Sequence, residues 1–128
     1  MSKLKHKSIL KLIGFSLKDF QNNNNPVIIT EYSSNGLLSD NSQLNATQKL
    51  IIVLGIAEGI QYIHSQSILH RNIQSNSIQL DESFYPKISN FETSITFSEI
   101  KTQSKKEPIV VGGPFYISPE VYKKKEYS

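Results

Sequence analysis

Three short groups of polar residues could take part in chemistry, and they follow one another in a fixed order. His70-Arg71-Asn72 comes directly after a long helical segment, Asn90-Phe91-Glu92 follows a short hairpin, and Tyr116 to Glu120 (YISPE) comes about 25 residues later. The three histidines, at positions 6, 64 and 70, do not have the spacing of metal ligands. Each string taken singly carries little information, so their order and spacing have to carry the interpretation.

Composition limits the classes of protein that this chain can belong to. It has 128 residues, of which 38% are hydrophobic and 20% charged, which allows one domain with a modest core. The net charge of +3 is small and the lysines are spread out, so we expect no nucleic-acid partner.

Cysteine content and hydropathy bear on the compartment. The chain has no cysteine, which rules out disulfides and thiolate metal sites and fits a reducing compartment. The longest apolar stretch, Leu50 to Ala57, is too short to span a bilayer. We therefore expect a soluble cytoplasmic protein with no membrane partner.

The pattern of apolar residues and turn residues predicts a mixture of strands and helices. Strands are expected at Ile9–Phe15 and Val27–Thr30, and a short hairpin at Ile78–Leu80 and Tyr85–Ile88. The polar stretch from Thr93 to Glu107 is expected to be a mobile loop, and Ser118-Pro119-Glu120 is expected to open a last short helix.

The strongest helix prediction covers Ala46 to Gln66. Asn45 can cap it, with Gln48 three residues later in a capping-box arrangement. One apolar stripe carries Leu50, Val53, Leu54, Ala57 and Ile60, and isoleucines on the other faces predict a helix buried on most sides. Gly55 and Gly59 would each weaken the helix by ~1 kcal/mol, which predicts that another element packs closely against them.

The order of the motifs resembles the catalytic half of a eukaryotic protein kinase, most closely the tyrosine-kinase-like group. The phrases IAEGIQYIHSQSILHRNI and GGPFYISPEV carry the resemblance, which covers Leu4 to Tyr122. It implies an α+β fold, part of the two-lobed kinase domain: the end of the N-lobe, the hinge, helix αE, the catalytic loop and the activation segment. The partial domain is assigned to residues 3–122, and residues 123–128 to a C-terminal tail.

The resemblance also assigns roles to residues outside the catalytic loop. Thr30 takes the gatekeeper position, Glu31 and Tyr32 begin the hinge, and Gln79 stands where a leucine usually floors the adenine ring. His70 and Phe91 are expected to stack with Leu12 in the family's internal spine. The remaining two assignments are Arg71, which either pairs with a phosphorylated activation-segment residue or faces solvent, and Glu120, whose family partner lies beyond Ser128.

At the positions that the family uses for phosphoryl transfer, this chain carries neutral side chains. Asn72 stands at the proton-acceptor position and Gln74 at the phosphate-contacting lysine, while Ser77 and Asn90 stand at the Mg²⁺-binding positions. An amide cannot accept the proton, a role worth ~10²–10⁴ in rate, and Mg²⁺ prefers charged oxygen ligands. The chain also has no glycine-rich loop and no strand lysine ahead of Lys3.

These departures lead to three hypotheses for function. The first is a pseudokinase that acts, if at all, as a binding or scaffold module, without ATP or Mg²⁺, and whose partner is a protein or the missing kinase segments. The second is an active serine/threonine or tyrosine kinase domain seen in part, which would use ATP and Mg²⁺. The third is a truncated gene product without function, which the sequence does not separate from the first.

Overall fold

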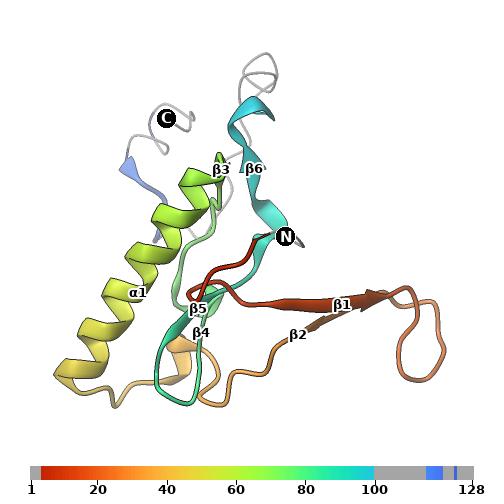
Figure 1. Cartoon of the computed structure of the whole chain (residues 1–128), viewed down its shortest axis with the longest axis horizontal. Helices are drawn as coiled ribbons and strands as arrows, with labels where there is room; N and C mark the ends of the chain where they lie inside the picture. The colour runs from red at the N-terminus through yellow and green to blue at the C-terminus, as the bar shows by residue number, and fades with distance from the viewer. Residues whose placement is uncertain (1–3, 100–114, 120–122, 124–128) are drawn as a thin grey trace.

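The computed structural model describes residues 4–99, 115–119 and 123, and it contains one long helix with several short strands and turns (Figure 1). In chain order the elements are β1 (Leu12–Ser16), β2 (Val27–Thr30), η1 (Leu38–Asp40), α1 (Ala46–Ser65), β3 (Ile68–Leu69), η2 (Ser75–Ser77), β4 (Ile78–Leu80), β5 (Pro86–Ile88), η3 (Phe91–Thr93) and β6 (Ile95–Thr96). This mixture agrees with the α+β class expected from the sequence.

The strands form three separate antiparallel pairs, β1 with β2, β3 with β6 and β4 with β5. The β1–β2 pair projects away from the rest of the molecule, on the side opposite α1 (Figure 1). Its outer side chains, among them Ile13, Phe15 and Ile28, are exposed. Because an isolated two-stranded hairpin is marginally stable at best, this part of the fold depends on its connections to the core.

Helix α1 begins at the residue that the sequence predicted. The Asn45 side chain accepts a hydrogen bond from the Gln48 N–H at 2.9 Å, and the Gln48 side chain accepts one from the Asn45 N–H at 2.9 Å. This reciprocal capping box satisfies two of the N–H groups that the first turn leaves without a helical partner. The helix ends at Ser65, one residue earlier than expected.

The core lies where α1 packs against β4 and β5. Its buried hydrophobic side chains are Ile9, Ile52, Ile63, Ile78, Leu80, Ile88 and Phe91. The face of α1 that turns inward carries Ile52, Gly55, Gly59 and Ile63. A Cβ on Gly55 would lie 2.5 Å from Pro86 Cγ, so β5 approaches the helix backbone directly, as the two glycines led us to expect.

Four of the five residues of the apolar stripe expected on α1 do not face the core, and for them the prediction was wrong. The fifth, Ile60, is half-buried and packs against the core. Leu50, Val53 and Leu54 are 59%, 63% and 56% exposed, and Ala57 is exposed as well. The prediction assumed that the bulkiest apolar residues face the core. In the structure, β5 packs instead against the side of the helix that carries Gly55 and Gly59, where the lack of side chains allows a close approach. In the described part of the chain, α1 is therefore buried on one side.

The other element predictions met mixed outcomes. The strand at Val27–Thr30 was correct, the hairpin was correct to within one residue, and the first strand begins at Leu12 rather than at Ile9. The loop expected from Thr93 is instead ordered at its start, where β6 pairs with β3. Residues 100–107 of that loop, and most of the helix expected after Ser118, lie outside the described residues.

No helix in the described segments has the length and hydropathy that a membrane crossing requires.

Candidate functional site

His70 directly follows β3, and its buried side chain lies against the residues at the end of β5. Its Nε2 lies 2.8 Å from the Ser89 carbonyl oxygen, and the Asn72 N–H donates to its Nδ1 at 3.2 Å. A carbonyl can only accept, so Nε2 carries the proton and the ring is neutral. Burial lowers the pKa of His70 below its ordinary value of 6.5, against a smaller opposing effect of the hydrogen bond to Ser89.

The same imidazole contacts Phe91, with ring centroids 4.6 Å apart in an edge-to-face arrangement. Phe91 is 8% exposed and belongs to the core. This is the His70–Phe91 contact expected from the sequence. Leu12, the third residue of the expected stack, begins β1 and is half-buried.

Arg71 connects this segment to η3. Its backbone is left-handed, with φ of 65°, and its Nε donates to the Thr93 carbonyl oxygen at 2.6 Å. The Thr93 hydroxyl donates in return to the His70 carbonyl oxygen at 3.1 Å. Glu120, the other residue to which the resemblance assigned a pairing role, lies outside the described residues.

Asn72, Gln74 and Ser77 form one hydrogen-bonded loop. Gln74 Nε2 donates to Asn72 Oδ1 at 2.9 Å. Ser77 Oγ donates to the Gln74 carbonyl oxygen at 2.8 Å and accepts from the Gln74 N–H at 3.0 Å. Ser77 is fully buried, with 0% exposure. Its hydroxyl therefore bonds within the loop, to both backbone groups of Gln74, and is not exposed to solvent.

Asn90 follows β5 and has a left-handed backbone, with φ of 59° and ψ of 55°. Its side chain is exposed, and Nδ2 donates to the Asn76 carbonyl oxygen at 3.3 Å. The oxygens available at the two expected metal positions are thus an enclosed hydroxyl and a neutral amide, a poor match to the charged oxygens that Mg²⁺ prefers. Within the described residues, no group of three or more His, Cys, Asp or Glu side chains could hold a metal ion.

The four residues assigned to adenine binding come together in one open hollow of about 350 Å³. Thr30, Glu31, Tyr32 and Gln79 line it, together with residues that the sequence reading missed, Ser33, Gly36 and Leu37. Tyr32 is 88% exposed. The side-chain hydroxyl of Ser33 is buried and has no hydrogen-bond partner among the described residues, so the lining of the hollow contains one unsatisfied polar atom.

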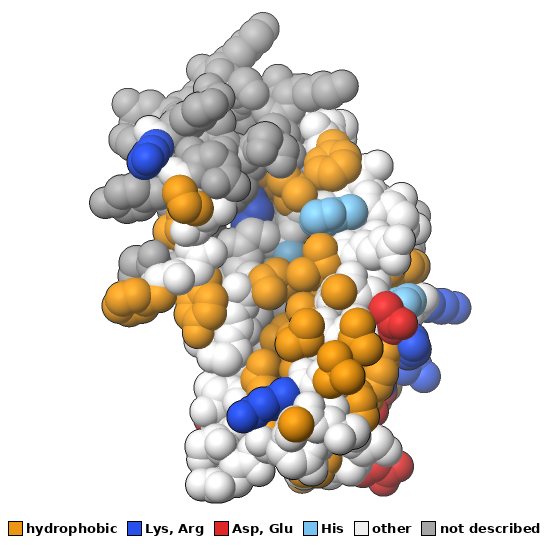
Figure 2. Space-filling model, turned by 90° about the vertical axis from the view of Figure 1, so that its left-hand side faces the viewer, with side chains coloured by type: hydrophobic (Ala, Val, Ile, Leu, Met, Phe, Trp, Pro, Cys, Tyr) orange, Lys and Arg blue, Asp and Glu red, His pale blue; other side chains and the backbone are white. Residues whose placement is uncertain are grey.

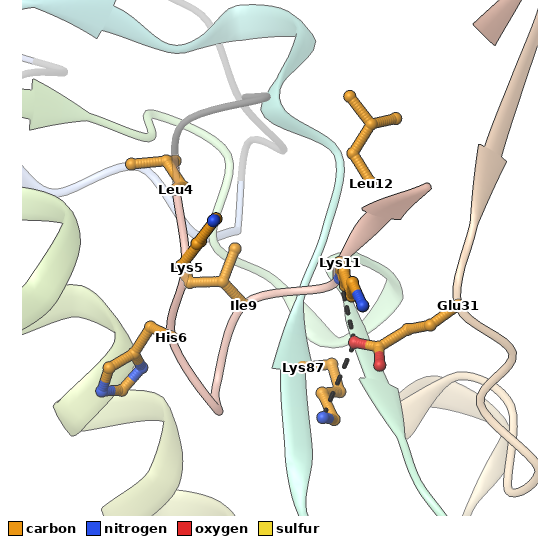
Figure 3. A pocket seen from close by; sticks show the side chains of 8 residues that line it. All are labelled: Leu4, Lys5, His6, Ile9, Lys11, Leu12, Glu31 and Lys87. Carbon is orange, nitrogen blue, oxygen red and sulfur yellow. Dashed lines mark hydrogen bonds and ion pairs between the residues drawn. The ribbon is translucent and has the colours of Figure 1, made fainter. Parts of the chain in front are cut away.

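Glu31 is held in place by the backbone of Lys11 and the side chain of Lys87 (Figure 3). Its Oε1 accepts from the Lys11 N–H at 2.9 Å and lies 3.6 Å from Lys87 Nζ, and Lys87 also lies 4.0 Å from Asp81 Oδ2. The sequence reading missed Lys87. Its signal was the alternation in β5, because Lys87 lies between the buried Pro86 and Ile88 and pairs with Gln79 across the hairpin.

Comparison with known proteins identifies the class to which this fold and loop belong. The family model described as protein tyrosine and serine/threonine kinase matches residues 1–128. The chain therefore belongs to the protein kinase family, and it represents part of a kinase domain.

The relatives of this chain include plant receptor-like kinases. Cysteine-rich receptor-like protein kinase 27 of Arabidopsis thaliana is 35% identical over 130 residues, covering 94% of this chain and 20% of the relative. Receptor-like protein kinase THESEUS 1 and receptor-like protein kinase HERK 1, from the same plant, are 31% and 30% identical, each covering 98% of this chain and 15% and 16% of the relative. The chain thus spans a fifth or less of the length of these relatives.

Proposed function

We propose that this kinase-family segment is non-catalytic and acts by binding another polypeptide. The observation that carries the proposal is the enclosed hydroxyl of Ser77, which is hydrogen-bonded to both backbone groups of Gln74. At this position the family binds Mg²⁺, whereas here the oxygen serves to close the loop. The loop is thus held together by hydrogen bonds among its own residues, which supports a segment without phosphoryl transfer.

The neighbouring side chains support the same proposal. Asn72 stands at the proton-acceptor position, but an amide oxygen bonded to Gln74 has neither the charge nor the proton affinity of a carboxylate. Asn90 offers a neutral amide at the second metal position. Since phosphoryl transfer depends on positioning and on charge stabilisation, these neutral groups leave it without its main contributors. The proposal therefore includes no bound ATP or Mg²⁺.

The binding role is supported by the outward face of α1. Leu50, Val53, Leu54 and Ala57 recur at helical spacing and are exposed, and Figure 2 shows hydrophobic side chains gathered over this side of the molecule. Soluble proteins seldom leave a contiguous apolar patch in water, and such patches mark interaction sites. The proposed occupant is an apolar polypeptide surface, either a protein partner or further segments of the kinase domain. No nucleic-acid or membrane partner is proposed, and a cytoplasmic location, which fits the absence of cysteine, remains part of the proposal.

An active kinase domain is the second candidate, and the names of the relatives favour it, because each is called a protein kinase. Under this alternative, Thr30, Glu31, Tyr32 and Gln79 would hold ATP and the loop would rearrange to bind Mg²⁺. A truncated gene product without function is the third. It shares the lack of catalysis but would have no specific partner.

Two measurements separate these functions. In a thermal-shift titration with Mg²⁺-ATP, the proposal expects no change in melting temperature, because a ligand stabilises only the state that it binds. In a radiolabelled phosphate-transfer assay on a generic protein substrate, it expects no incorporation above background. A saturating rise in melting temperature at sub-millimolar ATP, together with incorporation that Asn72→Ala abolishes, would establish the active kinase instead.

A further inference from the structure

A second recess, which has Glu31 in common with the adenine hollow, lies between the N-terminal segment, the start of β1, and β5 (Figure 3). Its volume is about 370 Å³, within the ~300–1,000 Å³ typical of ligand pockets. Its lining residues are Leu4, Lys5, His6, Ile9, Lys11, Leu12, Glu31 and Lys87. None of the roles assigned to the catalytic loop uses this recess.

The lining separates into an apolar part and a basic part. Leu4, Ile9 and Leu12 contribute hydrocarbon, and Ile9 is 3% exposed because it belongs to the core. Three lysines face one carboxylate, which leaves an excess of two positive charges. A ligand that fits this lining combines an apolar group with negative charge.

The lysines differ in how far they are already neutralised. Lys87 lies between Glu31 and Asp81, at 3.6 Å and 4.0 Å, and its side chain is 17% exposed. The residues Lys5 and Lys11 are exposed, and no carboxylate of the described segments lies within ion-pair distance of either ammonium group. These two lysines are therefore the ones available to an incoming anion.

We propose that this recess binds a partner polypeptide through an acidic amphipathic segment. An apolar side chain of the partner would lie against Leu4, Ile9 and Leu12, and its carboxylates would pair with Lys5 and Lys11. Charge complementarity selects this occupant, because a purely apolar segment would leave both ammonium groups at the edge of the interface without a counter-charge. The site goes beyond the proposed function, since it is separate from both the catalytic loop and the outward face of α1.

The test uses the full chain and two fluorescein-labelled peptides in an anisotropy titration. In the first peptide, leucines recur at helical spacing with glutamates between them, and in the second each glutamate is replaced by glutamine. The proposal expects the acidic peptide to bind more tightly and to weaken as salt is raised, because exposed ion pairs are screened. Equal binding of the two peptides would overturn the proposal.

Single substitutions localise the interaction. Lys5→Gln and Lys11→Gln are each expected to weaken binding roughly two- to five-fold, the range of an exposed ion pair, whereas Lys18→Gln, at an exposed lysine outside the recess, should leave it unchanged. These variants keep the backbone bonds of Lys5 to Tyr62 and of Lys11 to Glu31, so they are expected to fold. Glu31→Gln removes the one carboxylate of the recess and should tighten binding.

Methyl NMR spectra and a competitor complete the test. The proposal expects the peptide to shift the methyl signals of Ile9 and Leu12 and to leave those of Leu50 and Leu54 in place. The reverse pattern would assign the peptide to α1 and overturn the proposal. Competition by inorganic phosphate with the same dependence on Lys5 and Lys11 would also overturn it, by identifying a phosphate site.

Discussion

Gly59 lies so close to Ile88 that a Cβ built on the glycine would stand 2.7 Å from Ile88 Cδ1. The same added atom would lie 3.0 Å from Ser8 Cβ, so the N-terminal segment crosses the helix at this point as well. One turn earlier, Gly55 has the same relationship to the ring of Pro86. Contact between β5 and the bare helix backbone thus joins the hairpin to α1.

The first prediction concerns these glycines. Gly55→Ala and Gly59→Ala should destabilise the fold, because overpacking typically costs ~1–3 kcal/mol while alanine regains ~1 kcal/mol of helix propensity. Gly55 should be the more sensitive, since the ring of Pro86 cannot rotate away. The measurement is the free energy of unfolding in urea. Gly14→Ala is the matched control, because a Cβ there meets nothing within 4 Å. A stabilised Gly55→Ala variant would contradict the close packing.

The elements with strong local signals were predictable from the sequence. The capping pair Asn45 and Gln48 fixed the start of α1, and the β-branched residues of Val27–Thr30 gave β2 with its bounds. The hairpin at Ile78–Leu80 followed from apolar residues on either side of Asp81 and Glu82. Each of these signals acts over a few residues and needs no knowledge of tertiary packing.

The features that the sequence did not predict depend on contacts between distant residues. The inward face of α1 was not predicted because the position of β5 decides which side of the helix is buried. β5 approaches Gly55 and Gly59, and Leu54 stays exposed. The β3–β6 pair was missed because Ile95 and Thr96 give no strand signal without Ile68 and Leu69 beside them. At the site, the sequence showed that positions 72, 74, 77 and 90 carry neutral side chains. It did not predict the hydrogen bond that Ser77 Oγ donates to the Gln74 carbonyl oxygen.

The second prediction is a loss of stability in mild acid that depends on His70. Burial lowers the folded-state pKa of His70 below the unfolded value of about 6.5. Above pH 6.5 the imidazole is neutral in both states and its contribution is fully present. As the pH falls below 6.5 the unfolded state binds the proton first, so stability decreases until the folded pKa is reached. Protonation would also place a hydrogen on Nδ1, which could then no longer accept the hydrogen bond from the Asn72 N–H.

The measurement for His70 is the urea midpoint on either side of pH 6.5, for wild type and for His70→Gln. Glutamine can still donate to the Ser89 carbonyl oxygen but does not titrate, so the variant should be less stable at neutral pH and lose less of its stability in mild acid. His64→Gln is the control, since His64 lies on the exposed side of α1. An unchanged pH dependence in His70→Gln would show that His70 is not the group responsible.

The third prediction concerns the outward face of α1. Leu50→Gln, Val53→Gln and Leu54→Gln should each change the free energy of unfolding by less than about 0.5 kcal/mol, the usual range for surface positions, and together should reduce self-association. Ile52→Ala, at a side chain 3% exposed, should instead cost ~2–5 kcal/mol. Light scattering and hydrogen exchange on the isolated chain provide the readouts. A monodisperse wild-type monomer with strong cooperative protection would contradict the view that this face needs a covering surface.

The fourth prediction is that restoring two carboxylates does not restore phosphoryl transfer. Asn72→Asp fits the present structure, because Gln74 Nε2 already donates to Oδ1 and a carboxylate accepts the same bond. Asn90→Asp gives up one long bond, of 3.3 Å, to the Asn76 carbonyl oxygen, and aspartate tolerates the left-handed backbone there. Both substitutions should therefore leave the fold intact, so that a lack of activity reflects chemistry and not unfolding.

The double variant should remain at background in a radiolabelled phosphate-transfer assay, because Ser77 still turns its hydroxyl onto Gln74 and Gln74 itself carries no charge. The effects of residues that act as a unit in catalysis are not additive, so restoring the proton acceptor, a role worth ~10²–10⁴ in rate, recovers little while other members of the set are missing. Circular dichroism on both proteins supplies the folding control. Activity in the double variant alone would mean that the two carboxylates suffice and that the enclosed Ser77 is no obstacle to Mg²⁺. Activity in wild type that Asn72→Ala abolishes would mean that the amide takes part in catalysis, and the non-catalytic proposal would then be wrong.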